Sequence, residues 1–316
     1  MSTARRTPDG FVYASLAELM ALEPRARGLS FVARQPLSSI LSGNHASRLR
    51  GRGLSFDELR HYVPGDDLRH LDWRASLRYG KPFVRTFSEE RDRPTLLLVD
   101  QRMSMFFGSQ RYFKSVTAAQ LAAVCAWMAL QAGDRVGGMV LGEAGVEHLR
   151  PLRSRARVQA LCAAVVRANH RLSAQGEALA DDGRLDQLLR TCIGAAGHDH
   201  LVCVISDFAG VGEQTLALLR QLRQHNDVIA LQVYDPIALQ LPDKGRLSVT
   251  QGAVQVEMDI GRSQVRRPLG DYLAGRLREV AELLRRSQVP LLMISTGDDS
   301  LEQLRKELGR LAERAR

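Results

Sequence analysis

Two acidic residues and a serine have the types and spacing of a divalent-metal site. Asp100 follows the apolar run 95–99, and Asp207 follows the apolar run 201–205 after one serine. Ser104 lies four residues beyond Asp100. Carboxylate and hydroxyl oxygens are the hard ligands that Mg²⁺ prefers in proteins. The three residues therefore indicate a candidate metal site, provided that the fold brings them together.

The elements that must position these residues are buried strands. The runs 95–99 and 201–205 are too short for ordinary helices and apolar throughout, which is typical of strands in a parallel sheet. From residue 95 onward, strand patterns alternate with helix patterns, so we predict an α/β fold with a doubly wound, mostly parallel sheet. Ligands of such sheets bind at the carboxyl ends of the strands, where Asp100 and Asp207 would lie.

We predict two parts in the chain. Residues 1–92 form an N-terminal extension, and residues 93–316 form the α/β domain, with a small β insertion at about 236–266. A short helix is expected in the extension at 16–23, with Ser15 as its N-cap. Further helices are expected at 112–131, 156–168, 185–193, 214–225, 269–286 and 301–314, and further strands at 81–87, 135–141, 146–149, 227–233 and 289–294.

Composition indicates a soluble, cytoplasmic protein. The chain has 316 residues, of which 45% are hydrophobic and 25% charged, as in ordinary globular proteins. Its longest apolar stretch, 121–130, is shorter than the ~18 residues that cross a bilayer, and its polar start has no signal-peptide core. The four cysteines fall within apolar patterns and are expected to be buried thiols.

The net charge of +9 raises the question of a polyanionic partner. The cations are interspersed with acids and only 5% of residues are aromatic, which argues against a nucleic-acid surface. No phosphate-binding glycine loop, dinucleotide fingerprint or hydrolase nucleophile elbow occurs, so no small-molecule substrate is predicted.

A segment upstream of the first buried strand is dense in arginine and aspartate. These residues are either a surface network of paired charges or part of a binding site. The candidate interaction residues there are Arg60, Asp66, Asp67, Arg69, Asp72 and Trp73.

The chain resembles two related patterns. Asp100, Ser104 and Asp207 are similar to the metal-ion-dependent adhesion site of the von Willebrand factor type A fold, which reads D-x-S-x-S with a later Thr and Asp. The upstream Pro-Gly-Asp-Asp and Asp-Trp block resembles the bacterial domain of unknown function 58 family, from about residue 43 to the C-terminus. The resemblance implies a protein-interaction module that acts with a MoxR-type AAA+ ATPase on client proteins. Because such a fold presents its ligand site at the carboxyl edge of the sheet, we expect the interacting surface around Asp100, Ser104 and Asp207, with Phe208 as a further interaction residue.

This sequence departs from the adhesion-site pattern at two places. Arg102 stands at the first serine, and no threonine occurs near 183–185. In such a fold the strands before Asp100 and Asp207 are neighbours, so the carboxylates repel unless a cation lies between them. A guanidinium cannot ligate a metal but can bridge carboxylates. We favour a salt bridge from Arg102 in place of a metal, and hence no cofactor; the alternative is a weak Mg²⁺ site with Arg102 turned outward.

The sequence is compatible with three functions. The favoured one is a non-enzymatic interaction module. The second is a metal-dependent hydrolase that uses Asp100 and Asp207, although no general base or nucleophile lies beside them in sequence. The third is a basic nucleic-acid binder.

Overall fold

The apolar run that ends at Asp100 forms a central strand, β3 (Thr95–Gln101), in which every residue is buried. It pairs in parallel with β4 (Val136–Gly142) on one side and β6 (Leu201–Ser206) on the other. The six-stranded sheet is completed by β7 (Asp227–Tyr234), β10 (Leu291–Ser295) and the antiparallel edge strand β5 (Gly145–Leu152), in the order β10-β7-β6-β3-β4-β5. The predicted mostly parallel α/β fold is confirmed.

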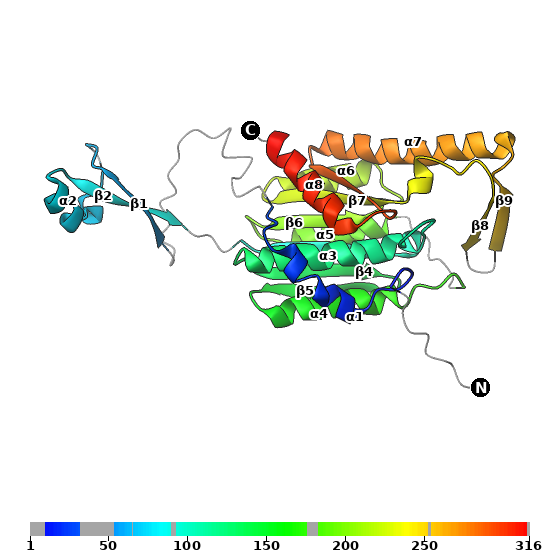
Figure 1. The fold of residues 1–316 in the computed structure, drawn as a ribbon, viewed down its shortest axis with the longest axis horizontal. Helices are drawn as coiled ribbons and strands as arrows, with labels where there is room; N and C mark the ends of the chain where they lie inside the picture. The colour runs from blue at the N-terminus through cyan, green and yellow to red at the C-terminus, as the bar shows by residue number, and fades with distance from the viewer. Residues whose placement is uncertain are drawn as a thin grey trace. The chain divides into compact units, whose positions relative to one another are not determined.

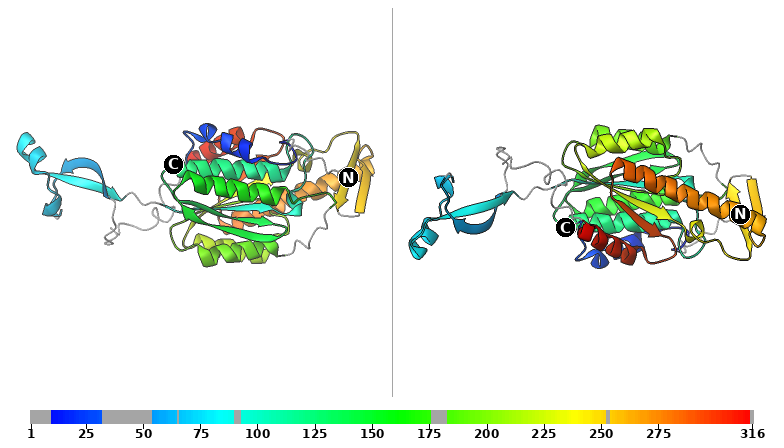
Figure 2. Two further views of the ribbon diagram at one scale, coloured as in Figure 1. Left: turned by 90° about the horizontal axis from the view of Figure 1, so that it is seen from below. Right: turned by 90° about the horizontal axis from the view of Figure 1, so that it is seen from above.

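Helices cover both faces of this sheet (Figures 1 and 2). One face carries α1 (Leu16–Ala21), α3 (Lys114–Gln131), α4 (Arg155–Asn169) and α8 (Ser300–Arg314). The other face carries α5 (Arg184–Ala195), α6 (Glu213–Arg223) and α7 (Ser263–Ser287). Because side chains alternate across a strand, Leu97 and Val99 belong to the first core, and Leu96 and Leu98 to the second.

The chain divides into two compact units, residues 1–37 with 93–316 and residues 38–92, and each is described by itself. The computed structural model describes residues 10–31, 54–64, 66–89, 93–175, 183–251 and 254–314. Residues 10–31, which the sequence analysis assigned to the extension, therefore group with the α/β domain.

The described segment 10–31 packs on the α/β domain through α1. Ser15 caps this helix and Glu18 completes a capping box, so the predicted cap is confirmed. Leu19 is only 1% exposed and packs in the core beneath α1, and the Ala14 N–H donates to Asn169 Oδ1 at 2.9 Å. A single 3-10 turn, η1 (Pro24–Ala26), follows and buries Ala26.

The small unit is built on a hairpin. β1 (Leu54–His61) pairs antiparallel with β2 (Phe83–Glu89), and between them lie η3 (Leu68–His70) and α2 (Trp73–Tyr79). The strand expected at 81–87 corresponds to β2, whereas β1 was not predicted from the sequence.

Two-stranded pairing also occurs in the α/β unit. The segment predicted as a β insertion starts with the turn η5 (Pro236–Ala238), and its strands β8 (Arg246–Gln251) and β9 (Val254–Asp259) pair antiparallel.

The cysteines lie where their apolar patterns place them. All four are free thiols and buried. Burial raises the pKa of Cys162, Cys192 and Cys203 to about 12. Because a thiolate is the reactive form, these buried groups are inert packing residues. Among the described residues, no helix combines the length and the hydropathy needed to span a membrane.

We predict that α1 contributes measurably to the stability of the α/β unit. Leu19→Ala removes a buried side chain from the core and should lower the free energy of unfolding by about 2–4 kcal/mol. Leu239→Ala is the matched control, because Leu239 is 62% exposed. Urea unfolding of the full chain measures both changes, and equal midpoints would contradict a core role for α1.

Candidate functional site

The carboxyl ends of β3 and β6 bring the predicted residues to one edge of the sheet. Val99 of β3 lies in register with Ile205 of β6, so Asp100 is next to Ser206 and Asp207 follows. The prediction that these two strands are neighbours is confirmed. Together with the loop after β4, this edge forms what we call the ion-paired rim: Asp100, Arg102, Ser104, Lys114, Glu143, Arg184, Ser206 and Asp207.

Asp100 and Arg102 form a buried ion pair at the centre of the rim. The Asp100 side chain is 1% exposed and that of Arg102 is 0% exposed. Arg102 donates from Nη2 to Asp100 Oδ2 at 2.8 Å, from Nε to Oδ1 at 3.0 Å, and from its backbone N–H to Oδ1 at 3.0 Å. The Ser206 hydroxyl donates to Asp100 Oδ2 at 2.6 Å, and Arg102 Nη2 also donates to the carbonyl of Ala209. Both carboxylate oxygens therefore accept hydrogen bonds from protein groups.

Asp207 has a different cationic partner, Lys114 at the first position of α3. The Lys114 ammonium lies 2.6 Å from Asp207 Oδ2, and Ser104 Oγ donates to Oδ1 at 3.3 Å. Burial alone would raise the pKa of Asp207, but the charge and hydrogen bond of Lys114, together with the Ala209 N–H, oppose it, and the pKa is lowered. Arg102 adds a smaller lowering by its charge. The positive charge that we expected from one bridging arginine is thus divided between two side chains.

A third pair lies where the fold resemblance led us to look for a threonine. Arg184 begins α5 and donates to Glu143 Oε2 at 3.0 Å, and its side chain is 15% exposed. Glu143 Oε1 accepts the Met103 backbone N–H at 2.8 Å, which connects the β4–β5 turn to the loop after β3. Sequence reasoning missed Glu143, Lys114 and Arg184, because only the fold brings their elements to this edge.

The rim residues do not fit a divalent cation. Mg²⁺ needs oxygen lone pairs directed at a single point, and those of Asp100 are taken by Arg102 and Ser206. Arg102 is not turned outward, as the metal-bound alternative requires, but fully buried. Within the described ranges, no group of three or more acidic, histidine or cysteine side chains could hold a metal ion.

Phe208, predicted as an interaction residue, is fully buried in the second core. Its φ of +56° is unusual for a bulky residue, and its N–H donates to Ser206 Oγ at 2.9 Å. A partner could contact its ring only after the rim rearranged. The left-handed backbone at Phe208 turns the chain sharply after Asp207.

The interaction residues predicted in the small unit are largely paired with one another. Arg60 holds Asp66 through two hydrogen bonds of 2.8 and 2.6 Å, and Arg69 holds Asp67 in the same manner. In each aspartate the arginine hydrogen bond is the main cause of a lowered pKa. These pairs stabilise the local fold, and a role for them in binding stays a prediction.

Asp72 and Trp73 have opposite environments. Asp72 is buried, caps α2 by accepting the Ala75 N–H at 2.9 Å, and accepts from Arg85 Nε at 2.7 Å. The cap and, to a lesser extent, Arg85 lower its pKa. Trp73, the next residue, is 69% exposed.

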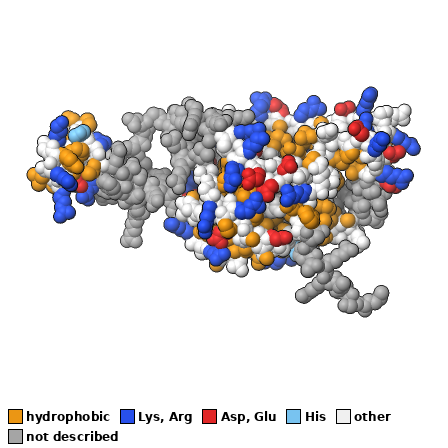
Figure 3. Space-filling view, in the orientation of Figure 1, with side chains coloured by type: hydrophobic (Ala, Val, Ile, Leu, Met, Phe, Trp, Pro, Cys, Tyr) orange, Lys and Arg blue, Asp and Glu red, His pale blue; other side chains and the backbone are white. Residues whose placement is uncertain are grey.

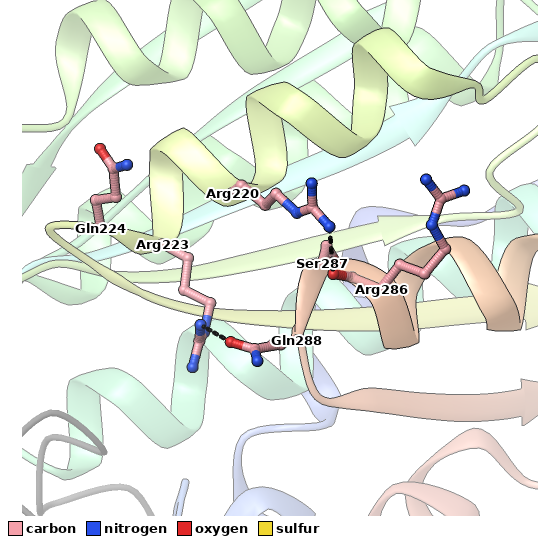
Figure 4. A pocket seen from close by; sticks show the side chains of 6 residues that line it. All are labelled: Arg220, Arg223, Gln224, Arg286, Ser287 and Gln288. Atoms are coloured by element: carbon pink, nitrogen blue, oxygen red, sulfur yellow. Dashed lines mark hydrogen bonds between the residues drawn. The ribbon is translucent and has the colours of Figure 1, made fainter. Parts of the chain in front are cut away.

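A second polar site, where α6 and α7 end, has a structural explanation (Figure 4). Arg220 donates to the Arg286 carbonyl at 3.1 Å, and Arg223 donates to Gln288 Oε1 at 2.7 Å. Arg286 itself pairs with Glu213 at 2.7 Å. Helix C-termini carry partial negative charge, which these arginines balance. We interpret this pocket, lined by Arg220, Arg223, Gln224, Arg286, Ser287 and Gln288, as helix capping.

We predict that Mg²⁺ does not bind the unmodified protein. Calorimetric titration should give no binding heat, and Mg²⁺ should leave the melting temperature unchanged, whereas an ion at ~100 times its dissociation constant adds about 2.7 kcal/mol. Arg102→Ser removes the internal cation and restores an oxygen, so Mg²⁺ should raise the melting temperature of this variant. Stoichiometric Mg²⁺ binding to the unmodified protein, lost in Asp100→Ala, would refute the interpretation.

We also predict a pH signature for Lys114→Met. A lowered folded pKa stabilises the protein above the unfolded aspartate pKa of about 3.9, and this contribution is lost as the pH falls through the folded pKa. Without Lys114, burial raises the pKa of Asp207, so the variant should lose about 3 kcal/mol near neutral pH. The loss should shrink towards about pH 4, where Asp207 of the variant binds a proton.

Urea unfolding at both pH values measures this difference. Adding Asp207→Asn to Lys114→Met is the control, because it removes the unpaired charge and should recover part of the stability near neutral pH. A deficit that does not change with pH would mean that Lys114 acts through packing alone.

The chain is similar to several known proteins in sequence and to solved structures. The chain is 27% identical over 280 residues to uncharacterized proteins of Mycobacterium bovis and Mycobacterium tuberculosis, with 88% of this chain and 86% of theirs covered. It is similar to the conserved hypothetical protein BatB from Bacteroides thetaiotaomicron, at 9% identity and a TM-score of 0.42, covering 70% of this chain and 99% of that one. It is also similar to the SpRpn10 VWA domain, at 12% identity and a TM-score of 0.37, covering 68% and 94%.

A family model matches across both units of the chain. The match covers residues 58–275, which include most of the small unit and the strands before Asp100 and Asp207. Because this match covers more than half of the sequence, the chain belongs to the family described as "Protein of unknown function DUF58".

Proposed function

We propose that this protein is a non-enzymatic interaction module that acts with a MoxR-type AAA+ ATPase in the assembly or activation of client proteins. The class of partner comes from the resemblance to the domain of unknown function 58 family described in the sequence analysis. The cytoplasm is the proposed location, since an AAA+ ATPase needs ATP and four free thiols suit a reducing compartment.

The observation that favours binding over catalysis is the internal pairing of the rim carboxylates. Asp100, Glu143 and Asp207 each have a cationic side chain as partner. A general base needs a lone pair that the substrate can reach and a pKa near the working pH. Asp100 has both oxygens engaged, and the lowered pKa of Asp207 makes it a weak base. The metal-dependent hydrolase is therefore the weaker alternative.

Residues 54–89 lend no support to the nucleic-acid alternative, and the net charge of +9 lies in the rest of the chain. Residues 54–89 contain six Lys and Arg and six Asp and Glu, so this segment has no net charge. Counterion release from a nucleic acid needs a surface with a clear excess of cations.

The test is complex formation between the full chain and a MoxR-type AAA+ ATPase from the same genome. We expect the two to elute together in size-exclusion chromatography and to bind at micromolar concentration or below. An unrelated AAA+ ATPase is the control and should elute separately. Failure to bind with and without a non-hydrolysable ATP analogue would contradict the proposal, and Mg²⁺-dependent phosphoester hydrolysis lost in Asp100→Asn would support the enzyme instead.

A further inference from the structure

The outer surface of α2 combines apolar and cationic side chains. Trp73 and Leu77 are 69% and 83% exposed, unusual values for large apolar residues in a helix. Residues four apart lie on the same side of a helix, so Trp73 lies beside Leu77 and Arg74 beside Arg78. At 3.6 residues per turn, the apolar and basic pairs are adjacent halves of one surface. We call these four residues the α2 face.

The side of α2 opposite to the α2 face is the one that contacts the hairpin. The opposite side of α2 is occupied by Ser76, whose hydroxyl donates to the Asp72 carbonyl at 2.7 Å and accepts the Phe83 N–H at 2.9 Å. The bond from Phe83, the first residue of β2, attaches the helix to the hairpin through this side. Trp73 and Leu77 lie on the other side of the helix, where most of their surface is exposed.

The positive charge of the α2 face is available to a partner. Asp66, Asp67 and Asp72 are each held by another arginine of the small unit. Arg74 and Arg78 have no carboxylate partner among the described residues, and the Arg78 guanidinium lies 5.8 Å from the centre of the Tyr79 ring. Figure 3 shows hydrophobic and basic side chains together on the described part of this unit.

Three kinds of occupant could cover such a surface, and its chemistry favours a protein. Seven helical residues with three exposed large apolar side chains, Trp73, Leu77 and Tyr79, bury little apolar area, and membrane binding scales with that area. Nucleic acid is disfavoured because the face offers only two arginines, Arg74 and Arg78, which would release few counterions. Tryptophan and arginine are the residue types that dominate protein interfaces when desolvated in a pocket.

We propose that the α2 face docks onto an acidic surface of the partner ATPase, with Trp73 and Leu77 in an apolar pocket and Arg74 and Arg78 against carboxylates at its edge. This inference rests on the proposed function and assigns its contact surface. The rim, whose charges are satisfied internally, then supports the fold and leaves recognition to the small unit.

The experiment compares full-chain variants for binding to the purified MoxR-type ATPase. Trp73→Ala with Leu77→Ala, and Arg74→Glu with Arg78→Glu, should each weaken binding about tenfold or more. Binding of the unmodified chain should also weaken with added salt, and the charge-reversed variant should lose that dependence. Arg190→Glu with Arg267→Glu is the matched control: it reverses the same charge at two exposed positions of the α/β unit and should bind normally.

Three outcomes would overturn the inference. The first is unmodified affinity in both α2 variants while the parent chain binds, which leaves the proposed function intact. The second is a lower melting temperature of the Leu77→Ala variant, because the face would then be covered within the chain. The third is binding to phosphatidylserine vesicles that Arg74→Glu with Arg78→Glu abolishes, because the surface would then serve a membrane. If the parent chain itself does not bind the ATPase, the proposed function fails first.

Discussion

The ion pair between Asp100 and Arg102 lies at the end of the central strand, and the geometry of the sheet edge depends on it. Taking two charges out of water is costly, and it is compensated only when hydrogen bonds satisfy both groups. Here the Ser206 hydroxyl and the Arg102 backbone N–H donate hydrogen bonds to the Asp100 carboxylate, and the Ala209 carbonyl accepts one from the Arg102 guanidinium. Ser206 ends β6, and Arg102 and Ala209 lie in the loops after β3 and β6, so the pair joins two neighbouring strand ends. The left-handed turn at Phe208 follows from the same arrangement, since its N–H bonds to the Ser206 hydroxyl.

Internal cations change what this edge of an α/β sheet can do. A divalent ion with an open coordination site can bind an oxygen of a partner protein. A buried guanidinium that is already hydrogen-bonded to a carboxylate cannot bind a ligand in this way. With Lys114 and Arg184 added, the rim resembles a folded core more than a ligand site. Recognition by such a protein is better supported by exposed side chains, of which the small unit has several of the types common in interfaces.

The sequence predicted some features of the fold and of the rim but not others, and the failures have physical causes. The position of Asp100 and Asp207 at strand ends could be predicted from the apolar runs before them, and their adjacency was implied by the resemblance to the von Willebrand factor type A fold. The partner of Asp207 could not, because Lys114 reaches it from α3, and a helix's rotation about its axis depends on packing. β1 was missed because its polar residues resemble a loop, and it is held by pairing with β2. α7 begins at Ser263, before Pro268, although a proline usually marks a helix boundary.

By itself, the sequence determined the α/β class, the order of most strands and helices along the chain and the burial of the cysteines, and it showed an arginine, Arg102, two residues after Asp100. These follow from local periodicity and residue chemistry, which the chain carries without reference to distant contacts. Only the tertiary structure decided which cation serves which carboxylate, that Phe208 is buried, and that Trp73 is exposed. Such features depend on how elements far apart in sequence pack together, and the same residue pattern is compatible with several packings.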